Sequence, residues 1–143
     1  MDLDILRRAA AARQRSRNAV YEPHLKPIPE MDAVVRQQLD KLVAAAFRLD
    51  ETLLEQPTRG KARVARARQV AMYLAHTVCG YSLTHVGTIF GRDRTTVAHA
   101  CAVIEECRED RDFDRAVEML ERSTRILQVH AVWVGAKVRR QGR

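Results

Sequence analysis

The segment 82–109 is the feature that most constrains the fold, because two helical patterns meet there across a short turn. Ser82 is placed to cap a short helix that ends at Gly91, and Asp93 is placed to cap a longer helix. Apolar residues recur on the inner face of the longer helix at Val97, Cys101 and Ile104. This order predicts a helix-turn-helix, a motif that places one helix across DNA phosphates and the next in the major groove.

Small residues in this segment predict a close crossing of the two helices. Gly87 lies within the first helix and Gly91 at its end, while Ala98 and Ala100 lie on the second. A glycine has no Cβ atom and tolerates a positive φ, so it suits both a close approach and a tight turn. Bulkier side chains at these positions would push the helices apart.

The entry of the second helix carries side chains that suit a DNA contact, namely Arg92, Asp93, Arg94, Thr95 and Thr96. Arginine can donate two hydrogen bonds to guanine, aspartate can accept one from cytosine, and threonine offers a hydroxyl and a methyl group. The free amide groups and the dipole of a helix N-terminus also favour a nearby phosphate. Asp93 and the threonines could instead serve only to start the helix, and the arginines favour the DNA-contact interpretation.

A second basic cluster lies upstream, where no acidic residue interrupts the cations between Pro57 and Gln69. Its members are Arg59, Lys61, Arg63, Arg66 and Arg68. Cations at a helix N-terminus oppose the helix dipole, so a phosphate or minor-groove contact would offset an unfavourable placement. A solvated helix start is the alternative interpretation.

Composition agrees with a folded protein that has a polyanionic partner. The chain has 143 residues, with 46% hydrophobic and 30% charged residues, which is typical of one globular domain. Lys and Arg outnumber Asp and Glu by 25 to 18, for a net charge of +7. No apolar run is long enough to cross a bilayer and the N-terminus lacks the order of a signal peptide, so we expect a cytoplasmic, nucleoid-associated protein without a membrane partner.

Three regions are expected along the chain. Residues 1–29 predict a basic N-terminal arm followed by a linker that several prolines keep extended. Residues 30–127 predict the DNA-binding domain, and residues 128–143 a C-terminal extension with a basic tail. The sequence VHAVWV within the extension is rich in residues that favour strands, and it leaves open whether a helix continues or a strand forms.

Apolar spacing predicts further helices within the domain. The pattern from Met31 predicts the longest core helix, and Asp50 is placed to cap a short helix that Pro57 stops. The stretch 58–63 is expected to be a loop, and a helix is expected from about Val64 to Gly80. A final helix, with Asp112 as its candidate cap, follows the helix-turn-helix.

These residues resemble the C-terminal DNA-binding domain of the bacterial replication initiator DnaA. The resemblance runs from about Met31 to Arg108 and is densest in VARARQVAMYLA (64–75) and YSLTHVGTIFGRDRTTVAHAC (81–101), followed by VIEECRED. It implies an all-α helical bundle with a helix-turn-helix of the DnaA C-terminal or Trp-repressor-like type. Because no GxxxxGKS/T motif occurs, it implies a stand-alone use of the domain, without the ATPase domain.

The resemblance also implies which residues contact DNA. Base reading in the family falls on the positions of Asp93 to Thr96, and phosphate contacts fall near Ser82, Leu83 and Arg68. An arginine that the family sends into the minor groove aligns with Gly60, so Arg59 or Lys61 would have to replace it. The full set that we expect to contact DNA is Arg59, Lys61, Arg63, Arg66, Arg68, His76, Ser82, Leu83, Thr84, Arg92, Asp93, Arg94, Thr95, Thr96 and His99.

Three departures from the family pattern bear on specificity. The turn reads FGRD where the family usually has one more glycine, Arg94 stands where it usually has histidine, and His76 replaces a typical lysine. A guanidinium and an imidazole present different donors to a base edge. We therefore expect the recognised sequence to differ from a DnaA box.

The expected function is sequence-specific binding of double-stranded DNA by a bacterial transcriptional or chromosome-associated regulator. The alternative is an adaptor that binds RNA polymerase or a replication initiator, with DNA contact secondary. Trp133 could be a core residue, which we favour, or an interface anchor for such a partner. The sequence leaves open the target site, the sign of regulation, and whether the protein is a monomer or a homodimer.

Enzyme, cofactor and metal functions are not indicated. No nucleophile elbow is present, and no glycine-rich phosphate loop follows a strand. His76 and Cys79 lie three apart and His85, His99 and Cys101 follow, but no second pair has the spacing of metal ligands. The cysteines Cys79, Cys101 and Cys107 are expected to be small buried apolar residues, typical of a reducing compartment.

Overall fold

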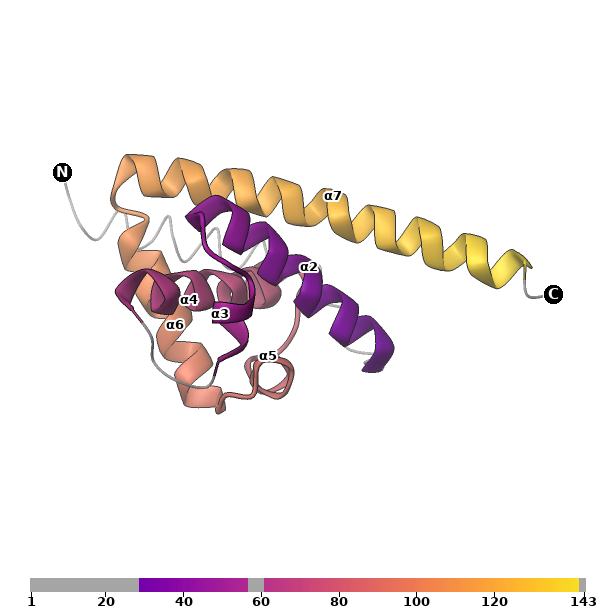
Figure 1. Cartoon of the computed structure of the whole chain (residues 1–143), viewed down its shortest axis with the longest axis horizontal. Coiled ribbons are helices and arrows are strands. Elements are labelled where there is room, and N and C mark those ends of the chain that lie inside the picture. The colour runs from indigo at the N-terminus through magenta and orange to yellow at the C-terminus, as the bar shows by residue number, and fades with distance from the viewer. Residues whose placement is uncertain (1–28, 57–60, 142–143) are drawn as a thin grey trace.

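The computed structural model describes residues 29–56 and 61–141, with side chains described for 32–56 and 61–128. Every element of regular structure in these ranges is an α-helix, which confirms the all-α prediction (Figure 1). The helices are α2 (Pro29–Phe47), α3 (Thr52–Glu55), α4 (Ala62–Thr77), α5 (Leu83–Phe90), α6 (Arg94–Cys107) and α7 (Arg111–Gln141).

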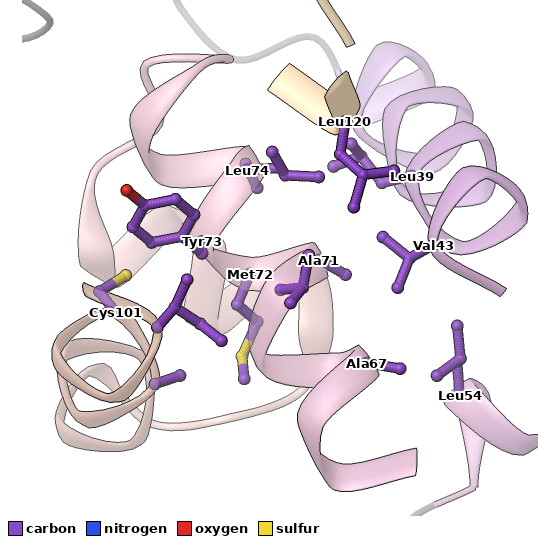
Figure 2. Packing of buried hydrophobic residues seen from close by; sticks show 14 of the residues in the cluster. Leu39, Val43, Leu54, Ala67, Ala71, Met72, Tyr73, Leu74, Cys101 and Leu120 are labelled. Atoms are coloured by element: carbon purple, nitrogen blue, oxygen red, sulfur yellow. The ribbon is translucent and has the colours of Figure 1, made fainter. Parts of the chain in front are cut away.

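Helix α4 forms the centre of the bundle, because it packs against α2, α3, α5, α6 and α7. Its residues from Val70 to Ala75 are all buried, as expected for a helix that is apolar on every side. Figure 2 shows Leu39 of α2 and Leu120 of α7 directed toward Leu74, and Leu54 of α3 facing Ala67. Helix α4, against which α5 and α6 pack, is therefore also held in place by α2, α3 and α7.

Local side chains fix the starts of α5 and α6 where the sequence predicted them. Ser82 Oγ accepts the His85 N–H at 3.1 Å, and Asp93 Oδ1 accepts the Thr96 N–H at 2.7 Å. Each bond satisfies an amide that has no partner inside its own helix, so the caps predicted at Ser82 and Asp93 are confirmed. Asp50 Oδ1 accepts the Thr52 N–H at 2.9 Å, but the residue that directly precedes α3 is Glu51, which makes no side-chain capping bond.

Other predicted boundaries were wrong. Helix α4 begins at Ala62 rather than after Arg63, so the predicted loop is shorter, and its residues 57–60 lie outside the described part of the chain. The cap of α7 is Asp110, whose Oδ1 accepts the Phe113 N–H at 2.9 Å, and not Asp112. Helix α7, with 31 residues, is longer than α2, with 19, because the segment after Gln128 continues as a helix.

The prediction that all three cysteines are buried was only partly correct. Cys101 is buried in the core, whereas Cys79 and Cys107 are half-buried. Burial raises the pKa of the Cys101 thiol to about 11 and that of Cys79 to about 12. Both thiols therefore stay protonated at neutral pH and behave as small apolar groups.

Candidate nucleic-acid interface

The α5–α6 turn is held by backbone contacts that only glycine permits. Gly91 ends α5 with a left-handed φ of 63°, and the Arg92 N–H donates to the Gly87 carbonyl at 2.9 Å. A Cβ atom on Gly87 would lie 2.5 Å from the Arg92 carbonyl oxygen. The small residue at Gly87 is therefore required by the turn backbone rather than by the crossing of the two helices.

The first turns of α6 expose the side chains that the sequence singled out for base reading. Asp93, Arg94, Thr95, Thr96 and His99 are all exposed. The bond from the Thr96 N–H lowers the pKa of Asp93 below its usual value, so the cap is an anion at neutral pH. Arg94 and His99 make no side-chain hydrogen bond with the described residues, which leaves their donors available for a ligand.

The start of α5 offers a second set of polar groups. Ser82 and Thr84 are exposed, whereas Leu83 is half-buried and packs against the core. The amides of Leu83 and Thr84 belong to the first turn and have no partner within the helix. This helix start can therefore bind an anion through backbone donors, while the Leu83 side chain anchors it.

The His76 side chain is held by a hydrogen bond within the protein. Its Nδ1 lies 2.7 Å from the carbonyl oxygen of Tyr81. Because a carbonyl oxygen only accepts, Nδ1 carries the proton and donates it. The half-buried imidazole thus links the end of α4 to the segment that enters α5.

The basic cluster divides into exposed and tethered members. Lys61 is exposed just before α4, and Arg63 is exposed but donates to the carbonyl oxygen of Phe47. Arg66 is half-buried and donates to Gln69 Oε1 at 3.2 Å. Arg59 lies outside the described residues. That Arg59 or Lys61 takes the place of the family's minor-groove arginine therefore remains a prediction.

Arg68 occupies an environment that the sequence did not indicate. Only 9% of the residue is exposed, and its guanidinium donates to the carbonyl oxygens of Leu53, Leu54 and Gln56 at 2.7, 3.2 and 2.6 Å. It therefore caps the C-terminus of α3 from inside α4. A phosphate contact by this side chain remains a prediction, and its described role is to fix the approach to α4.

Arg36 of α2 is a positioning residue that sequence reasoning missed. Its Nη1 donates to the Ile89 carbonyl oxygen at 2.9 Å, and its guanidinium lies 5.1 Å from the centre of the Phe90 ring. It also pairs with Asp40 at 3.4 Å. These contacts link α2 to the C-terminal end of α5, immediately before the turn.

A second link joins α2 to the start of α5. His85 Nε2 lies 2.9 Å from Asp32 Oδ2, and the His85 ring stacks on Tyr81 with centroids 4.7 Å apart. Burial raises the pKa of Tyr81 to about 12, so its hydroxyl stays neutral. Both links span 53 residues of sequence, so local pattern could not have revealed them.

Positive charge from three elements converges beside the turn. Burial lowers the pKa of Arg68, and the nearby charges of Arg92 and Arg36 lower it further. Asp40 is the acid that opposes this effect. An anion such as a DNA phosphate, placed beside Arg36, Arg68 and Arg92, would reduce the repulsion among their positive charges.

The described residues also bear on a membrane-spanning helix and on a metal site. Among 29–56 and 61–141, no helix is long and apolar enough to cross a membrane. Among the residues whose side chains are described, 32–56 and 61–128, no three or more His, Cys, Asp and Glu residues group so that they could hold a metal ion.

Comparison with known proteins supports the resemblance seen in the sequence. Residues 37–104 match the family described as the bacterial DnaA protein helix-turn-helix. The chromosomal replication initiator protein DnaA of Bacteroides fragilis is 35% identical over 94 residues, which cover 64% of this chain and 20% of that protein. A crystal structure of a DNA replication initiation factor matches with a TM-score of 0.60 and 32% identity, covering 68% of this chain and 30% of that one. This chain thus corresponds to a minor part of both relatives.

Proposed function

We propose that this protein binds specific sequences in double-stranded DNA as a transcriptional or chromosome-associated regulator, because residues 37–104 match the helix-turn-helix of the bacterial DnaA protein. The observation that carries the proposal is the exposed group at the start of α6, held on a capped, glycine-dependent turn. Rigid placement matters because base recognition depends on hydrogen bonds of defined geometry.

In this proposal the start of α6 enters the major groove. Arg94 donates a pair of hydrogen bonds to a guanine edge, and Thr95 and Thr96 contact neighbouring bases or thymine methyl groups. Asp93 keeps one carboxylate oxygen on the Thr96 amide, and the other can accept from a cytosine. Exposure of all four side chains supports this assignment.

Backbone contacts would position the reading helix. The first-turn amides of α5, with Ser82 and Thr84, suit one phosphate, and Arg92 suits another beside the turn. Lys61, with Arg59 and Arg63, suits the adjacent backbone or minor groove, and His99 suits a phosphate along α6. The convergence of cations near Arg92 supports an anionic partner at this corner of the molecule.

We assign the remaining regions supporting roles. The basic arm in 1–29 and the basic tail in 128–143 would add contacts to phosphates that do not depend on sequence. Such contacts raise affinity at low salt and favour residence on the chromosome. The core recognition unit would be 30–127.

A second candidate function is an adaptor for RNA polymerase or a replication initiator. The observation that favours it is the pair of exposed apolar residues Met119 and Ile126 on α7, which lie away from the α5–α6 turn in sequence. An adaptor would use these residues on a protein partner and would need little DNA affinity of its own.

Duplex binding as a function of salt separates these functions. Fluorescence anisotropy of the full chain with a labelled random-sequence duplex and with a duplex enriched from a random pool would be measured between low and physiological salt. A DNA-binding regulator should lose affinity by about 0.9 logarithmic units per phosphate contact for each tenfold rise in salt, and should prefer the enriched duplex at every salt. Absence of duplex binding at physiological salt would contradict the proposal and favour the adaptor.

A further inference from the structure

The C-terminal end of α5 is capped by a side chain from another helix. Ile89 is the last residue but one of α5, so its carbonyl oxygen has no N–H partner within that helix. Arg36 Nη1 of α2 donates to this oxygen at 2.9 Å. A cation at this end of a helix also interacts favourably with the helix dipole. Arg36 therefore acts as a C-terminal cap for α5, although it lies 53 residues earlier in the chain.

The Arg36 guanidinium is held in one orientation by contacts on several sides. Its Nε lies 3.4 Å from Oδ2 of Asp40, and only 4% of Asp40 is exposed. Its central carbon lies 5.1 Å from the centre of the Phe90 ring. A lysine carries one nitrogen and no planar fork, so it could not make these contacts together. The cap on Ile89 thus depends on the shape of arginine as well as on its charge.

A second polar contact joins α2 to α5 one helical turn away. His85 Nε2 lies 2.9 Å from Asp32 Oδ2. Asp32 and Arg36 are four residues apart on α2, and their partners His85 and Ile89 are four residues apart on α5. Residues four apart lie on the same face of a helix, so the two contacts join the facing sides of α2 and α5. Two such contacts fix the direction of α5 as well as its distance from α2.

The exposed start of α6 follows the capped end of α5 without an intervening linker. Gly91 ends α5, and Asp93 is already the N-terminal cap of α6. Between them, the Arg92 N–H donates back to the Gly87 carbonyl oxygen at 2.9 Å. Any change in the direction of α5 would therefore move Asp93 and the residues after it.

Arg36 itself is poorly placed for direct contact with DNA. Only 27% of its side chain is exposed, and Nε and Nη1 both face atoms of the protein. Asp32 and Arg36 also precede residues 37–104, the segment that matches the DnaA helix-turn-helix. Their role thus has to come from contacts within the protein.

We propose that Asp32 and Arg36 are positioning residues for base reading. Together they hold α5 against α2, so that the turn presents Asp93 and Arg94 to the base edges. Arg36 has the larger part, because it caps the end of α5 that leads into the turn. This role rests on the proposed function, and it extends the DNA-binding unit to the first turns of α2.

Amide hydrogen exchange of the full chain, measured by NMR, tests whether Arg36 holds the turn. Arg36→Lys should make the Arg92 amide exchange about tenfold faster, as expected for the loss of one charge-assisted hydrogen bond. Amides in the centre of α4, such as that of Leu74, should change less. Equal acceleration at both places would mean that Arg36 only stabilises the whole fold, and no change at Arg92 would mean that it does not hold the turn. Either result would contradict the proposal.

Duplex binding tests the effect on base reading. The measured quantity is the ratio of affinities for the enriched and the random-sequence duplex, which should fall about tenfold in Arg36→Lys and in Arg36→Gln. The salt slope should stay the same in both variants, because a positioning residue makes no phosphate contact. Lys41→Gln is the matched control, since it removes one cation from an exposed position of the same helix and should keep the ratio.

A different pattern would identify Arg36 as a phosphate contact. In that case Arg36→Gln would lower the salt slope by about 1, and Arg36→Lys would keep the ratio of the unmodified chain. That pattern would contradict the proposal.

Asp32→Ala provides the second variant if Arg36→Lys does not fold, as judged by circular dichroism. It removes the partner of His85 and should lower the ratio by less than Arg36→Lys, because Ser82 still caps the start of α5. An unchanged ratio in a folded Asp32→Ala variant would contradict the role of this contact.

Failure of the proposed function would look different. In that case the unmodified chain would show no preference for the enriched duplex. The exchange rate at Arg92 would still show whether Arg36 holds the turn.

Discussion

The backbone N–H of Arg92 donates a 2.9 Å hydrogen bond to the carbonyl oxygen of Gly87, and a Cβ atom on Gly87 would lie 2.5 Å from the Arg92 carbonyl oxygen. Cβ atoms in proteins do not approach a backbone oxygen so closely, so the turn can take this form only with glycine at position 87. Because Arg92 precedes Asp93 and Arg94, the placement of these proposed reading residues depends on Gly87.

Gly87→Ala should therefore move the turn. We expect a loss of about 1–3 kcal/mol in the free energy of unfolding, as for other overpacked sites, together with weaker DNA binding. Urea denaturation and anisotropy would measure the two effects. Thr88→Ala, at an exposed neighbouring position, is the control and should change neither by much. Equal stability of Gly87→Ala and the unmodified chain would show that the turn adapts to a side chain.

Gly91→Ala tests backbone conformation without a steric clash. A Cβ atom on Gly91 would meet no neighbour within 4 Å, but the φ of 63° is strained for alanine. The expected cost is about 1 kcal/mol in the free energy of unfolding. Gly91→Asn should cost less, because asparagine tolerates the left-handed region better. If the alanine and asparagine variants are equally stable, conformation at Gly91 does not limit stability.

Arg108 should be essential to the packing of α7 on α4 and α6. It donates to Tyr73, Asp114 and Glu121, and Glu121 is only 2% exposed. Although burial lowers the pKa of Arg108, the bonds to Asp114 and Tyr73 and the charge of Glu121 raise it overall. Arg108→Met should destabilise the fold by about 3–5 kcal/mol, because it leaves a buried carboxylate without this partner.

The double variant Arg108→Met/Glu121→Met provides the control for that effect. Removal of both charges leaves neither a buried carboxylate at position 121 nor a buried guanidinium at position 108, and should recover much of the lost stability. Chemical denaturation of the single and double variants would measure the difference. A double variant that is as unstable as Arg108→Met would show that the lost packing of the arginine, and not the isolated charge, dominates.

Asp40 should make stability depend on pH. Burial raises the pKa of Asp40 above 3.8, and Arg36 lowers it only in part. The folded state thus holds the Asp40 proton more tightly than the unfolded state does. Its contribution to stability is greatest below pH 3.8 and is lost as pH rises through the folded pKa.

Asp40→Asn removes this titration and keeps a similar shape. The stability of the unmodified chain relative to Asp40→Asn should fall as pH rises from below 3.8 and should level off above the folded pKa. Parallel denaturation series at each pH would give the difference. A difference that rises with pH would mean that the Arg36 pair outweighs burial.

Features that depend on neighbours in sequence were predictable. The caps at Ser82 and Asp93 follow from a side chain that reaches an amide three residues later, and the left-handed end of α5 follows from Gly91. The resemblance to DnaA added the all-α fold and a proposed reading helix. The sequence therefore predicted the local structure of the segment from Ser82 to Thr96, and its part in base reading stays a prediction.

Features that depend on packing were not predictable. Arg68 carries the same side chain as its basic neighbours, and only its position on the inner side of α4 directs it to the carbonyl oxygens after α3. Arg36 and His85 gained their roles from contacts across 53 residues. The segment after Gln128 combines strand-favouring valines with helix-favouring residues, so its sequence alone could not show that α7 continues.

The most direct test of the account compares Arg94→Ala with Lys61→Ala in selection from a random duplex pool. Arg94→Ala should lose the preference at one base pair, a difference of about 1–3 kcal/mol in binding free energy, while affinity for unrelated sequences changes little. Lys61→Ala should keep the preferred sequence, bind all duplexes more weakly, and reduce the salt slope by about 1. If Arg94→Ala selects the same sequence as the unmodified protein, with the same discrimination, then α6 does not read bases through Arg94 and the proposed interface is wrong.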